Sequence, residues 1–430
     1  MIDYIPLIYG AIAVICAALL AYAVTPPVRV LAYKIGAIDI PADSRRMHKK
    51  PIPRLGGLAI FVGFLITSLI FCDYSPALLS IWLGGAILCI LGTLDDIYRL
   101  HWLIKLVVQI AAASLAAVNG VSIGQINLGG GYIHLGVWSY PLTILWIVGL
   151  TNAINLIDGL DGLACGVSAI CSLSLLGVSL LMGDTGAALL IAILAGACLG
   201  FLPFNRNPAR IFMGDTGALF LGYTMAVVSV EGVMKTHALL SFLIPISIFA
   251  LPIFDTAFAI IRRLLHGKSP FSPDRGHLHH RLVDMGFTQK ETVGILYAIC
   301  GILGMVTITF TEVTVSDSRI IKTIGLAAAA LVILVINFLI MKNPSARYLS
   351  GLFDPNDIPP EQLSPDKKSE EKAPAAEEPI EFTAEIPAAP TSVSKNASSA
   401  QEEETESDEA IPIKKKKRKE SRFSKKQKLN

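Results

Sequence analysis

Charged residues are scarce in the first four-fifths of this chain, and this limits what it can fold into. The 430-residue chain contains 36 Lys/Arg and 34 Asp/Glu, of which 15 and 17 lie in residues 343–430. The first 342 residues are therefore only about 11% charged, against about 25% in soluble domains. So few charges could not cover a soluble surface. The distribution excludes a soluble enzyme or a nucleic-acid-binding protein over most of the chain, and predicts a polytopic membrane protein with a polar tail.

Long apolar runs predict an all-α membrane domain of about eleven transmembrane helices, because most of the runs approach the roughly 20 residues that cross a bilayer and only the fifth is short. The predicted spans are residues 5–24, 55–72, 77–93, 103–119, 139–151, 163–182, 187–204, 215–230, 239–260, 290–310 and 319–341. No basic region precedes the first run, so we expect a retained span rather than a cleaved signal peptide. The seven cysteines contain no CxxC pair and are interpreted as small buried residues.

The basic residues predict the orientation. Loops 25–53 and 261–289 are rich in Lys and Arg, whereas the second, fourth and sixth loops contain none. Cytoplasmic loops carry the excess of basic residues, so the odd-numbered loops are expected in the cytoplasm of a multi-pass plasma-membrane protein. The N-terminus is then outside and the C-terminus inside. Residues 121–138, which surround a GGG turn, are expected to form a small β-hairpin on the outer face.

The composition changes after the last predicted span. Residues 1–341 are predicted to form the membrane domain, and residues 342–430 a disordered cytoplasmic tail rich in Pro, Ala, Ser and Glu. An acidic run at 402–409 precedes a basic run at 414–428. The basic run is suited to anionic lipid, and a solvated tail without function is an equally good interpretation.

Polar residues gather in four segments, each after an odd-numbered span and therefore on the cytoplasmic side. They are Asp95 and Asp96; Asn152, Asn155, Asp158 and Asp161; Asp215; and His277, His279 and His280. Each segment alone has an ordinary explanation, such as a solvated helix end, a helix N-cap or a polar loop. Four of them on one face of a chain poor in charge indicate a functional site. Hard oxygen ligands suit Mg²⁺ or Mn²⁺, and HxHH lacks zinc-site spacing. Acidic groups beside Arg and His favour a metal-bound phosphate ester.

The motifs also carry a resemblance. They are RRMHKKPIPRLGG (45–57), LGTLDD (91–96), NAINLIDGLDGLA (152–164), FMGDTG (212–217) and DRGHLHHRL (274–282). In this order, and over residues 1–341, the chain resembles the polyprenyl-phosphate N-acetylhexosamine-1-phosphate transferases. The PRLGG and HLHHRL variants are more similar to the WecA/TagO branch than to the branch that makes the peptidoglycan lipid intermediate.

The resemblance implies a reaction and its partners. Undecaprenyl phosphate in the membrane would attack the β-phosphorus of cytoplasmic UDP-N-acetylglucosamine, with Mg²⁺ required. UMP would leave, and the undecaprenyl-diphospho-sugar would start a cell-envelope glycan such as teichoic acid. Another UDP-sugar donor, including UDP-MurNAc-pentapeptide, is the main alternative. A transporter, with its charges near mid-membrane, is the non-enzyme alternative. The oligomeric state stays open, with a homodimer as one option.

The resemblance also implies roles for individual residues. The expected catalytic residues are Asp95, Asp96, His279 and His280. The expected metal ligands are Asp215 and Asn155, with Asp158 as an alternative. Substrate binding is expected of Asp161, near the uridine, and of Asn152, His277, Arg275, Arg281, Arg54, Lys49 and His48. The last three are equally well explained as positive-inside anchors. A phosphate monoester is already largely a dianion at pH 7, so orientation by the paired aspartates is at least as plausible as base catalysis.

Overall fold

The computed structural model describes residues 5–40, 51–127, 132–234, 242–267, 269 and 276–315. Several predictions fall outside these residues. They are the predicted substrate-binding residues His48, Lys49 and Arg275, the eleventh span at 319–341, and the tail at 342–430. These stay predictions.

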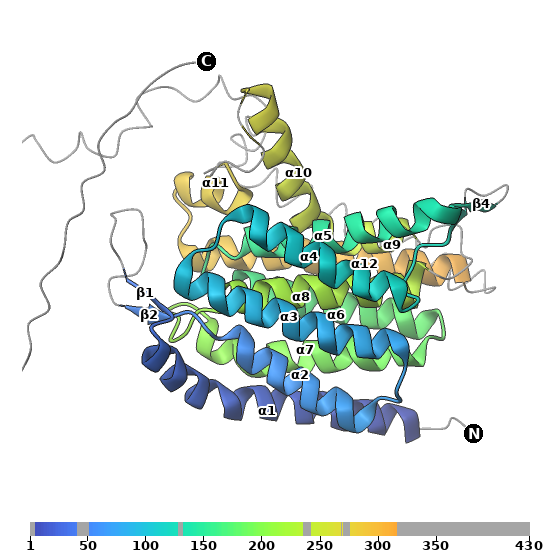
Figure 1. Cartoon of the computed structure of the whole chain (residues 1–430), viewed down its shortest axis with the longest axis horizontal. Helices are drawn as coiled ribbons and strands as arrows, with labels where there is room; N and C mark the ends of the chain where they lie inside the picture. Colours follow the sequence, from blue (N-terminus) through green and yellow to red (C-terminus); the bar gives the residue numbers. More distant parts are fainter. Residues whose placement is uncertain are drawn as a thin grey trace, which may run out of the picture. The chain divides into compact units, whose positions relative to one another are not determined.

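The described residues are mainly helical, as the sequence predicts. The long helices lie side by side, and the site described below is at the end of the bundle where the label β2 stands (Figure 1). The helices are α1 (Ile5–Ile35), α2 (Gly57–Phe71), α3 (Pro76–Tyr98), α4 (Trp102–Val118), α5 (Ser139–Ile157), α6 (Leu163–Leu181), α7 (Thr185–Asn205), α8 (Gly214–Ser229), α9 (Leu243–Ile248), α10 (Ala250–Leu265), α11 (Leu278–Asp284) and α12 (Gln289–Val315). The 3₁₀ helix η1 (Gly136–Trp138) precedes α5, and the π-helical turn η2 (Val230–Met234) follows α8.

Helix α8 is the centre of the bundle. It packs against α2, α3, α5, α6 and α7. Of the most apolar stretch of α8 with η2, 94% of the residues are buried, compared with 22% in α1 and 28% in α12. A helix that is apolar all round belongs inside a bundle, whereas the exposed sides of α1 and α12 suit a lipid environment. The start of α8, which carries Asp215, is therefore at the middle of one end of the bundle.

Glycines let the neighbouring helices approach the start of α8. A Cβ atom on Gly92 of α3 would lie 2.4 Å from the backbone of Thr216. A Cβ atom on Gly57 of α2 would lie 2.0 Å from the amide nitrogen of Gly217. Small residues of this kind allow membrane helices to pack backbone to backbone. The contact at Gly92 brings the last turn of α3, with Asp95 and Asp96, against the first turn of α8.

The helices confirm a multi-pass membrane protein. Within the described ranges, seven helical segments are long and apolar enough to span a membrane, and α2 and α4 are shorter apolar helices. Predicted spans one to eight and ten lie on these nine helices. The first helix continues through Pro26 and Pro27 to Ile35, so Arg29 is on a helix and not in the predicted loop. The total number of spans stays a prediction.

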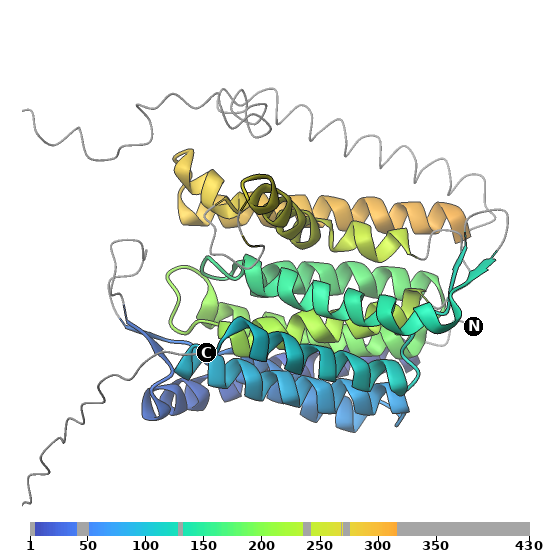
Figure 2. The same cartoon turned by 45° about the horizontal axis from the view of Figure 1, so that its top comes forward.

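The ninth predicted span is not one helix. The backbone breaks at Phe249, between the six-residue α9 and the separate helix α10. Helix α10 leaves the direction of the other helices (Figures 1 and 2). It has one apolar side with exposed Phe254 and Phe258, and it ends with Arg262 and Arg263. The apolar content of 239–260 predicted a span, but that apolar surface follows one face of a short helix.

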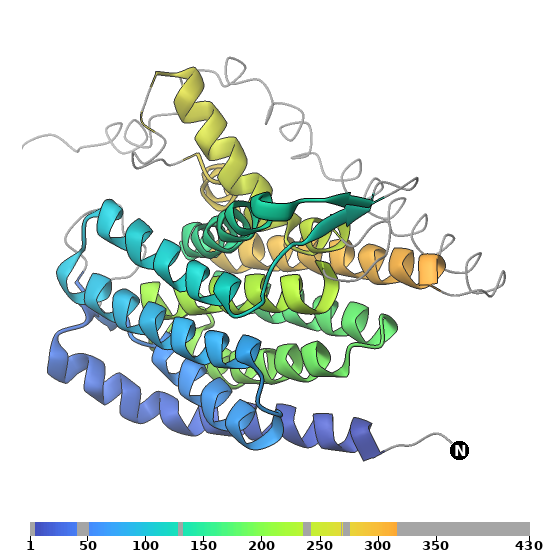
Figure 3. The same cartoon turned by 45° about the vertical axis from the view of Figure 1, so that its right-hand side comes forward.

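Two short hairpins mark opposite ends of the bundle. Strands β3 (Gln125–Asn127) and β4 (Tyr132–His134) pair antiparallel, with Ile126 opposite Ile133, and confirm the hairpin predicted within 121–138 (Figure 3). Strands β1 (Ile38–Asp39) and β2 (Ile52–Pro53) form a second pair that the sequence did not predict. The second pair places Asp39 and Arg54 at the same end as the start of α8.

Candidate functional site

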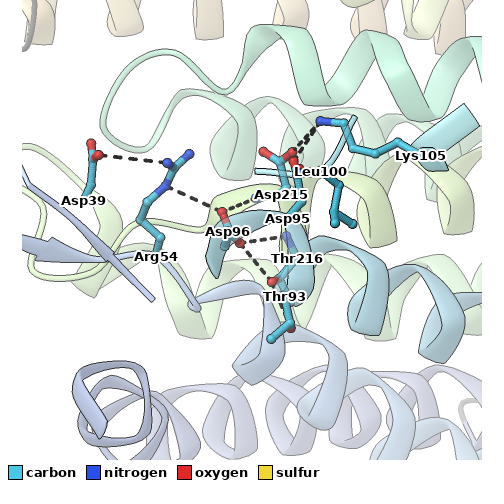
Figure 4. A network of polar contacts seen from close by, with 9 residues as sticks. All are labelled: Asp39, Arg54, Thr93, Asp95, Asp96, Leu100, Lys105, Asp215 and Thr216. Carbon is cyan, nitrogen blue, oxygen red and sulfur yellow. Dashed lines mark hydrogen bonds and ion pairs between the residues drawn. The ribbon is translucent and has the colours of Figure 1, made fainter. Parts of the chain in front are cut away.

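The carboxylate cluster, defined here as Asp95, Asp96 and Asp215 with Lys105, is built at three helix ends (Figure 4). Lys105, in the first turn of α4, places its Nζ 2.7 Å from Asp95 Oδ2 and 3.2 Å from Asp215 Oδ2. The ammonium group therefore joins the end of α3 to the start of α8. These charges lie at helix ends, not at the mid-membrane positions that the transporter alternative predicts.

Asp96 is bound mainly by the backbone of α8. Its Oδ1 accepts from the Asp215 amide at 3.2 Å, and its Oδ2 accepts from the Thr216 amide at 3.2 Å and the Thr216 hydroxyl at 3.0 Å. The first N–H groups of a helix have no partner within it, so Asp96 caps α8 from another helix. Its side chain is fully buried. These contacts make Asp96 a residue that fixes the position of Asp215, and its expected catalytic role stays a prediction.

Arg54 connects the cluster to the β1–β2 pair. Its Nε lies 3.5 Å from Asp96 Oδ1, and its Nη1 lies 4.0 Å from Asp39 Oδ1. The Arg54 side chain is 31% exposed, so part of the guanidinium still faces outwards. Arg54 was predicted from the PRLGG motif to bind substrate. Its place beside Asp96 puts a positive charge at the exposed edge of the carboxylate cluster.

Asn155, in the last turn of α5, and Asp158, directly after α5, add two more oxygen-bearing side chains near Asp215. The Asn155 side chain lies beside the Asp215 carboxylate. Asp158 caps the C-terminus of α5, and its neighbouring charges include Asp215 and Arg54. Burial, reinforced by the negative charge of Asp215, raises the pKa of Asp158 to about 8. The structure thus brings Asn155 and Asp158, which are neighbours in one motif, to Asp215, which lies about 60 residues further along the chain.

Two residues of the same motif are engaged by the protein itself. Asp161 Oδ2 accepts from Asn207 Nδ2 at 2.9 Å and from the Ala209 amide at 3.0 Å, and so holds the α7–α8 loop. Asn152 exchanges amide hydrogen bonds with buried Gln109 of α4, at 2.7 and 3.3 Å. Their predicted contacts with substrate stay predictions. In the structure, Asp161 connects the end of α5 to the α7–α8 loop, and Asn152 connects α5 to α4.

The histidine segment, residues 276–284, packs on the loop after α5. A Cβ atom on Gly159 would lie 2.3 Å from His279 Nε2, so the His279 ring rests directly on that glycine. The rings of His277 and His279 stack with centroids 5.8 Å apart, and His280 lies 4.3 Å from His279. His277 Nδ1 is 2.9 Å from Asp255 Oδ2 on α10. The predicted residue Arg281 is partly buried on α11.

His279 is held in its neutral form. It is only 3% exposed, and burial, followed by the nearby His280, lowers the pKa of His279 to about 4. A neutral ring at pH 7 donates one hydrogen bond and accepts one, but adds no positive charge. His279 is therefore suited to hydrogen bonding rather than to offsetting the charge of a diphosphate.

The oxygen ligands suit a shared Mg²⁺ site rather than a closed one. Among the residues that the structure describes, no three His, Cys, Asp or Glu side chains converge to hold a metal ion alone. Mg²⁺ commonly binds through one or two carboxylates together with substrate phosphates and water. Asp215 and Asp95, with Asn155 beside them, supply such an incomplete set of hard oxygen ligands. The residues present therefore fit the ion that the resemblance implies.

Lys105 and Asp255 are the site residues that the sequence analysis missed. Each is a single charged residue on an otherwise apolar helix or predicted span, and neither belongs to a motif. An ionisable residue in an apolar segment is a functional candidate by default, and that signal could have identified both.

The model of the family described as "Glycosyl transferase family 4" matches residues 78–233. A relative from Bacillus subtilis (strain 168), a probable undecaprenyl-phosphate N-acetylglucosaminyl 1-phosphate transferase, is 42% identical over 308 residues, covering 71% of this chain and 86% of the relative. A decaprenyl-phosphate N-acetylglucosaminephosphotransferase from Mycobacterium tuberculosis (strain ATCC 25618 / H37Rv) is 38% identical over 331 residues, covering 70% and 82%. An undecaprenyl-phosphate alpha-N-acetylglucosaminyl 1-phosphate transferase from Escherichia coli (strain K12) is 32% identical over 289 residues, covering 65% and 77%.

Proposed function

The chain belongs to the polyprenyl-phosphate N-acetylhexosamine-1-phosphate transferases, and from this premise we propose that it transfers N-acetylglucosamine-1-phosphate from UDP-N-acetylglucosamine to undecaprenyl phosphate. The products are UMP and undecaprenyl-diphospho-N-acetylglucosamine, the starting lipid of a cell-envelope glycan. The observation that carries the proposal is the 42% identity to a relative whose name states this activity. The carboxylate cluster and its two cations supply the charges that the reaction needs.

The reaction exchanges one P–O bond for another. An oxygen of the lipid phosphate attacks the β-phosphorus of the donor, and the bond from that phosphorus to the bridging oxygen breaks, so UMP leaves with the electron pair. The acceptor phosphate is already largely a dianion at pH 7, so no aspartate has to remove a proton. Lys105 and Arg54 contribute fixed positive charge, and Asp96 fixes the first turn of α8. Such positioning and charge stabilisation are the main means of catalysing phosphoryl transfer.

Asp215 and Asn155 would hold Mg²⁺ together with the donor's diphosphate, and Asp158 lies close enough to assist. The ion, when bound, polarises phosphate oxygens and offsets the charge of the leaving UMP. Lys105 sits between Asp95 and Asp215 at 2.7 and 3.2 Å, and so balances their negative charge beside such an ion. Asp158 would release its proton on taking part, because a metal ligand must be deprotonated.

The plasma membrane is the proposed location, with the site on its cytoplasmic face. The excess of basic residues in the odd-numbered loops supports this orientation. It is tested by cysteine labelling with a membrane-impermeant maleimide on intact cells. Asp73→Cys, in the exposed α2–α3 loop at the opposite end, should be labelled directly. Arg210→Cys, in the exposed α7–α8 loop, should be labelled only after permeabilisation.

The activity test uses the purified full chain with undecaprenyl phosphate, Mg²⁺ and radiolabelled UDP-N-acetylglucosamine. Transfer of label to lipid should be matched by UMP release and abolished by EDTA. Asp215→Asn should lower the rate by about 100- to 1,000-fold, as expected where a charge-stabilising group is lost. Asp184→Asn is the matched control, because Asp184 caps α7 at the opposite end and Asn caps equally well.

The possible outcomes distinguish a wrong donor sugar from a wrong reaction mechanism. Transfer from another UDP-sugar but not from UDP-N-acetylglucosamine would keep the reaction type and change the donor. Transfer that survives both EDTA and Asp215→Asn would refute the Mg²⁺ site. A folded protein that accepts no UDP-sugar would refute the proposed function.

A further inference from the structure

Helix α10 holds the histidine segment at two successive points. Arg262 Nη1 donates to the carbonyl oxygen of Gly276 at 2.9 Å. One face of α10 also presents Asp255, whose Oδ2 is 2.9 Å from His277 Nδ1 and whose Oδ1 accepts from the Leu278 amide at 2.8 Å. The Asp255 and His277 side chains are only 8% and 6% exposed. These bonds span 14 to 23 residues of sequence, so α10 fixes the segment from outside.

The two carboxylate oxygens of Asp255 accept hydrogen bonds from different groups. Oδ1 accepts from the first N–H group of α11, a seven-residue helix whose N-cap residue, His277, makes no side-chain cap. Oδ2 binds the His277 ring. An ionised carboxylate can only accept, so the ring must place a proton on Nδ1 and turn Nε2 away from Asp255. A third group that fixes the tautomer and direction of a histidine ring is a recurring feature of catalytic histidines.

The orientation of His277 is passed on by ring contact. The His277 and His279 rings are nearly parallel, with an interplanar angle of 10°. His279 rests on Gly159, next to Asp158, and its Nε2 is buried with no hydrogen-bond partner inside the described part of the chain. The stack of the two rings is the contact through which a tilt of His277 would reach His279.

We propose that Asp255 is a positioning residue of the transfer reaction, which sets the tautomer and direction of His277 and, through the ring stack, seats His279 against Gly159. It acts through the histidines and touches neither substrate. The inference rests on the proposed function, because His277 and His279 serve that reaction. It assigns a role to a residue of α10, which lies beyond the matched residues 78–233.

The test separates ring orientation from helix capping. Asp255→Asn keeps an oxygen for the Leu278 amide, but its NH₂ group faces His277 and reverses the tautomer. We expect kcat to fall by about 10- to 100-fold, the usual loss for such supporting partners. The melting temperature and the KM for UDP-N-acetylglucosamine should stay close to the wild-type values. Asp284→Asn, the same change at an exposed position on α11, is the matched control and should keep full activity.

A double-mutant cycle tests whether the effect passes through His277. If Asp255 works by orienting that ring, Asp255→Asn should lower kcat no further in a His277→Ala background. Multiplying losses, or wild-type kcat for Asp255→Asn with only Asp255→Ala impaired, would overturn the proposal. The second pattern would make Asp255 a helix cap alone.

A spectroscopic measurement needs no turnover. In ¹⁵N-histidine-labelled protein, with His277→Ala used for assignment, the proposal predicts a proton on Nδ1 of wild-type His277 and on Nε2 in Asp255→Asn. An unchanged tautomer would overturn the proposal. Should the wild-type protein transfer no label, the proposed function fails, and this measurement still decides whether Asp255 orients His277.

Discussion

The carboxylate cluster and the histidine segment are positioned in different ways. The cluster stands on the ends of long helices around the central helix α8, and glycines such as Gly92 bring those ends together. The histidine segment stands on a seven-residue helix that bonds with α10 hold in place. Packing of whole helices positions the first region, whereas a few side-chain bonds position the second. Substitutions should therefore act on the cluster through charge and on the segment through orientation.

The largest effect is expected at Lys105, where the cluster is held by charge. Lys105→Met keeps most of the side-chain volume but leaves Asp95 and Asp215 without their shared cation. The Lys105 side chain is 25% exposed, so the loss of stability should stay below the about 3–5 kcal/mol that a fully buried ion pair costs. The loss of one charge-stabilising group should lower kcat/KM by about 100-fold. The transfer assay and the melting temperature measure the two effects. Near wild-type activity would show that helix packing alone maintains the cluster.

The next effect is a pH dependence that belongs to the histidine segment. The pKa of His279 is about 4 in the folded protein and 6.5 in the unfolded chain. The unfolded state therefore binds a proton first, so stability is full above pH 6.5 and falls between pH 6.5 and about 4. The pKa difference corresponds to at most about 3 kcal/mol. Melting temperatures of wild type and His279→Gln should converge as the pH falls through this window. Parallel curves would refute the buried, neutral His279.

Much of the carboxylate cluster was predictable because its residues lie in motifs at the ends of apolar runs. Asp95, Asp96 and Asp215 came from those ends, and the structure brings them together. Lys105 was missed because it lies outside every motif, and its two partners, Asp95 and Asp215, are 10 and 110 residues away. Asp255 was missed because His277 is 22 residues away, and sequence spacing does not report such contacts. The hairpin within 121–138 was predicted because alternation and a glycine turn are local signals. The break in the ninth predicted span was missed, because apolar content alone does not distinguish one continuous helix from two shorter ones.

The His279 ring of the histidine segment rests on Gly159, next to Asp158, and a methyl group on Gly159 should push the ring away. Gly159→Ala would place Cβ 2.3 Å from His279 Nε2. A buried ring cannot yield freely, so overpacking of about 1–3 kcal/mol is expected, with roughly a tenfold loss of kcat. Gly149→Ala, on α5 with no atom within 4 Å of the new Cβ, is the matched control and should keep its activity. Equal activities of the two variants would mean that the His279 contact does not matter for the reaction.

The smallest effect tests whether Asn152 belongs to the site or to the bundle. Its amide exchanges hydrogen bonds with Gln109 at 2.7 and 3.3 Å, one turn below Lys105 on α4. Polar pairs between membrane helices are worth about 0.6 kcal/mol on average, so Gln109→Leu should lower the melting temperature slightly. The double variant Gln109→Leu/Asn152→Leu should recover stability, because replacing both partners by apolar groups leaves no unpaired amide. If Asn152 serves only this pair, the double variant should keep the wild-type KM for UDP-N-acetylglucosamine. A large rise in KM would instead support the substrate-binding role that the motif predicted. Asn152 would then have to exchange its hydrogen bonds with Gln109 for bonds to the donor.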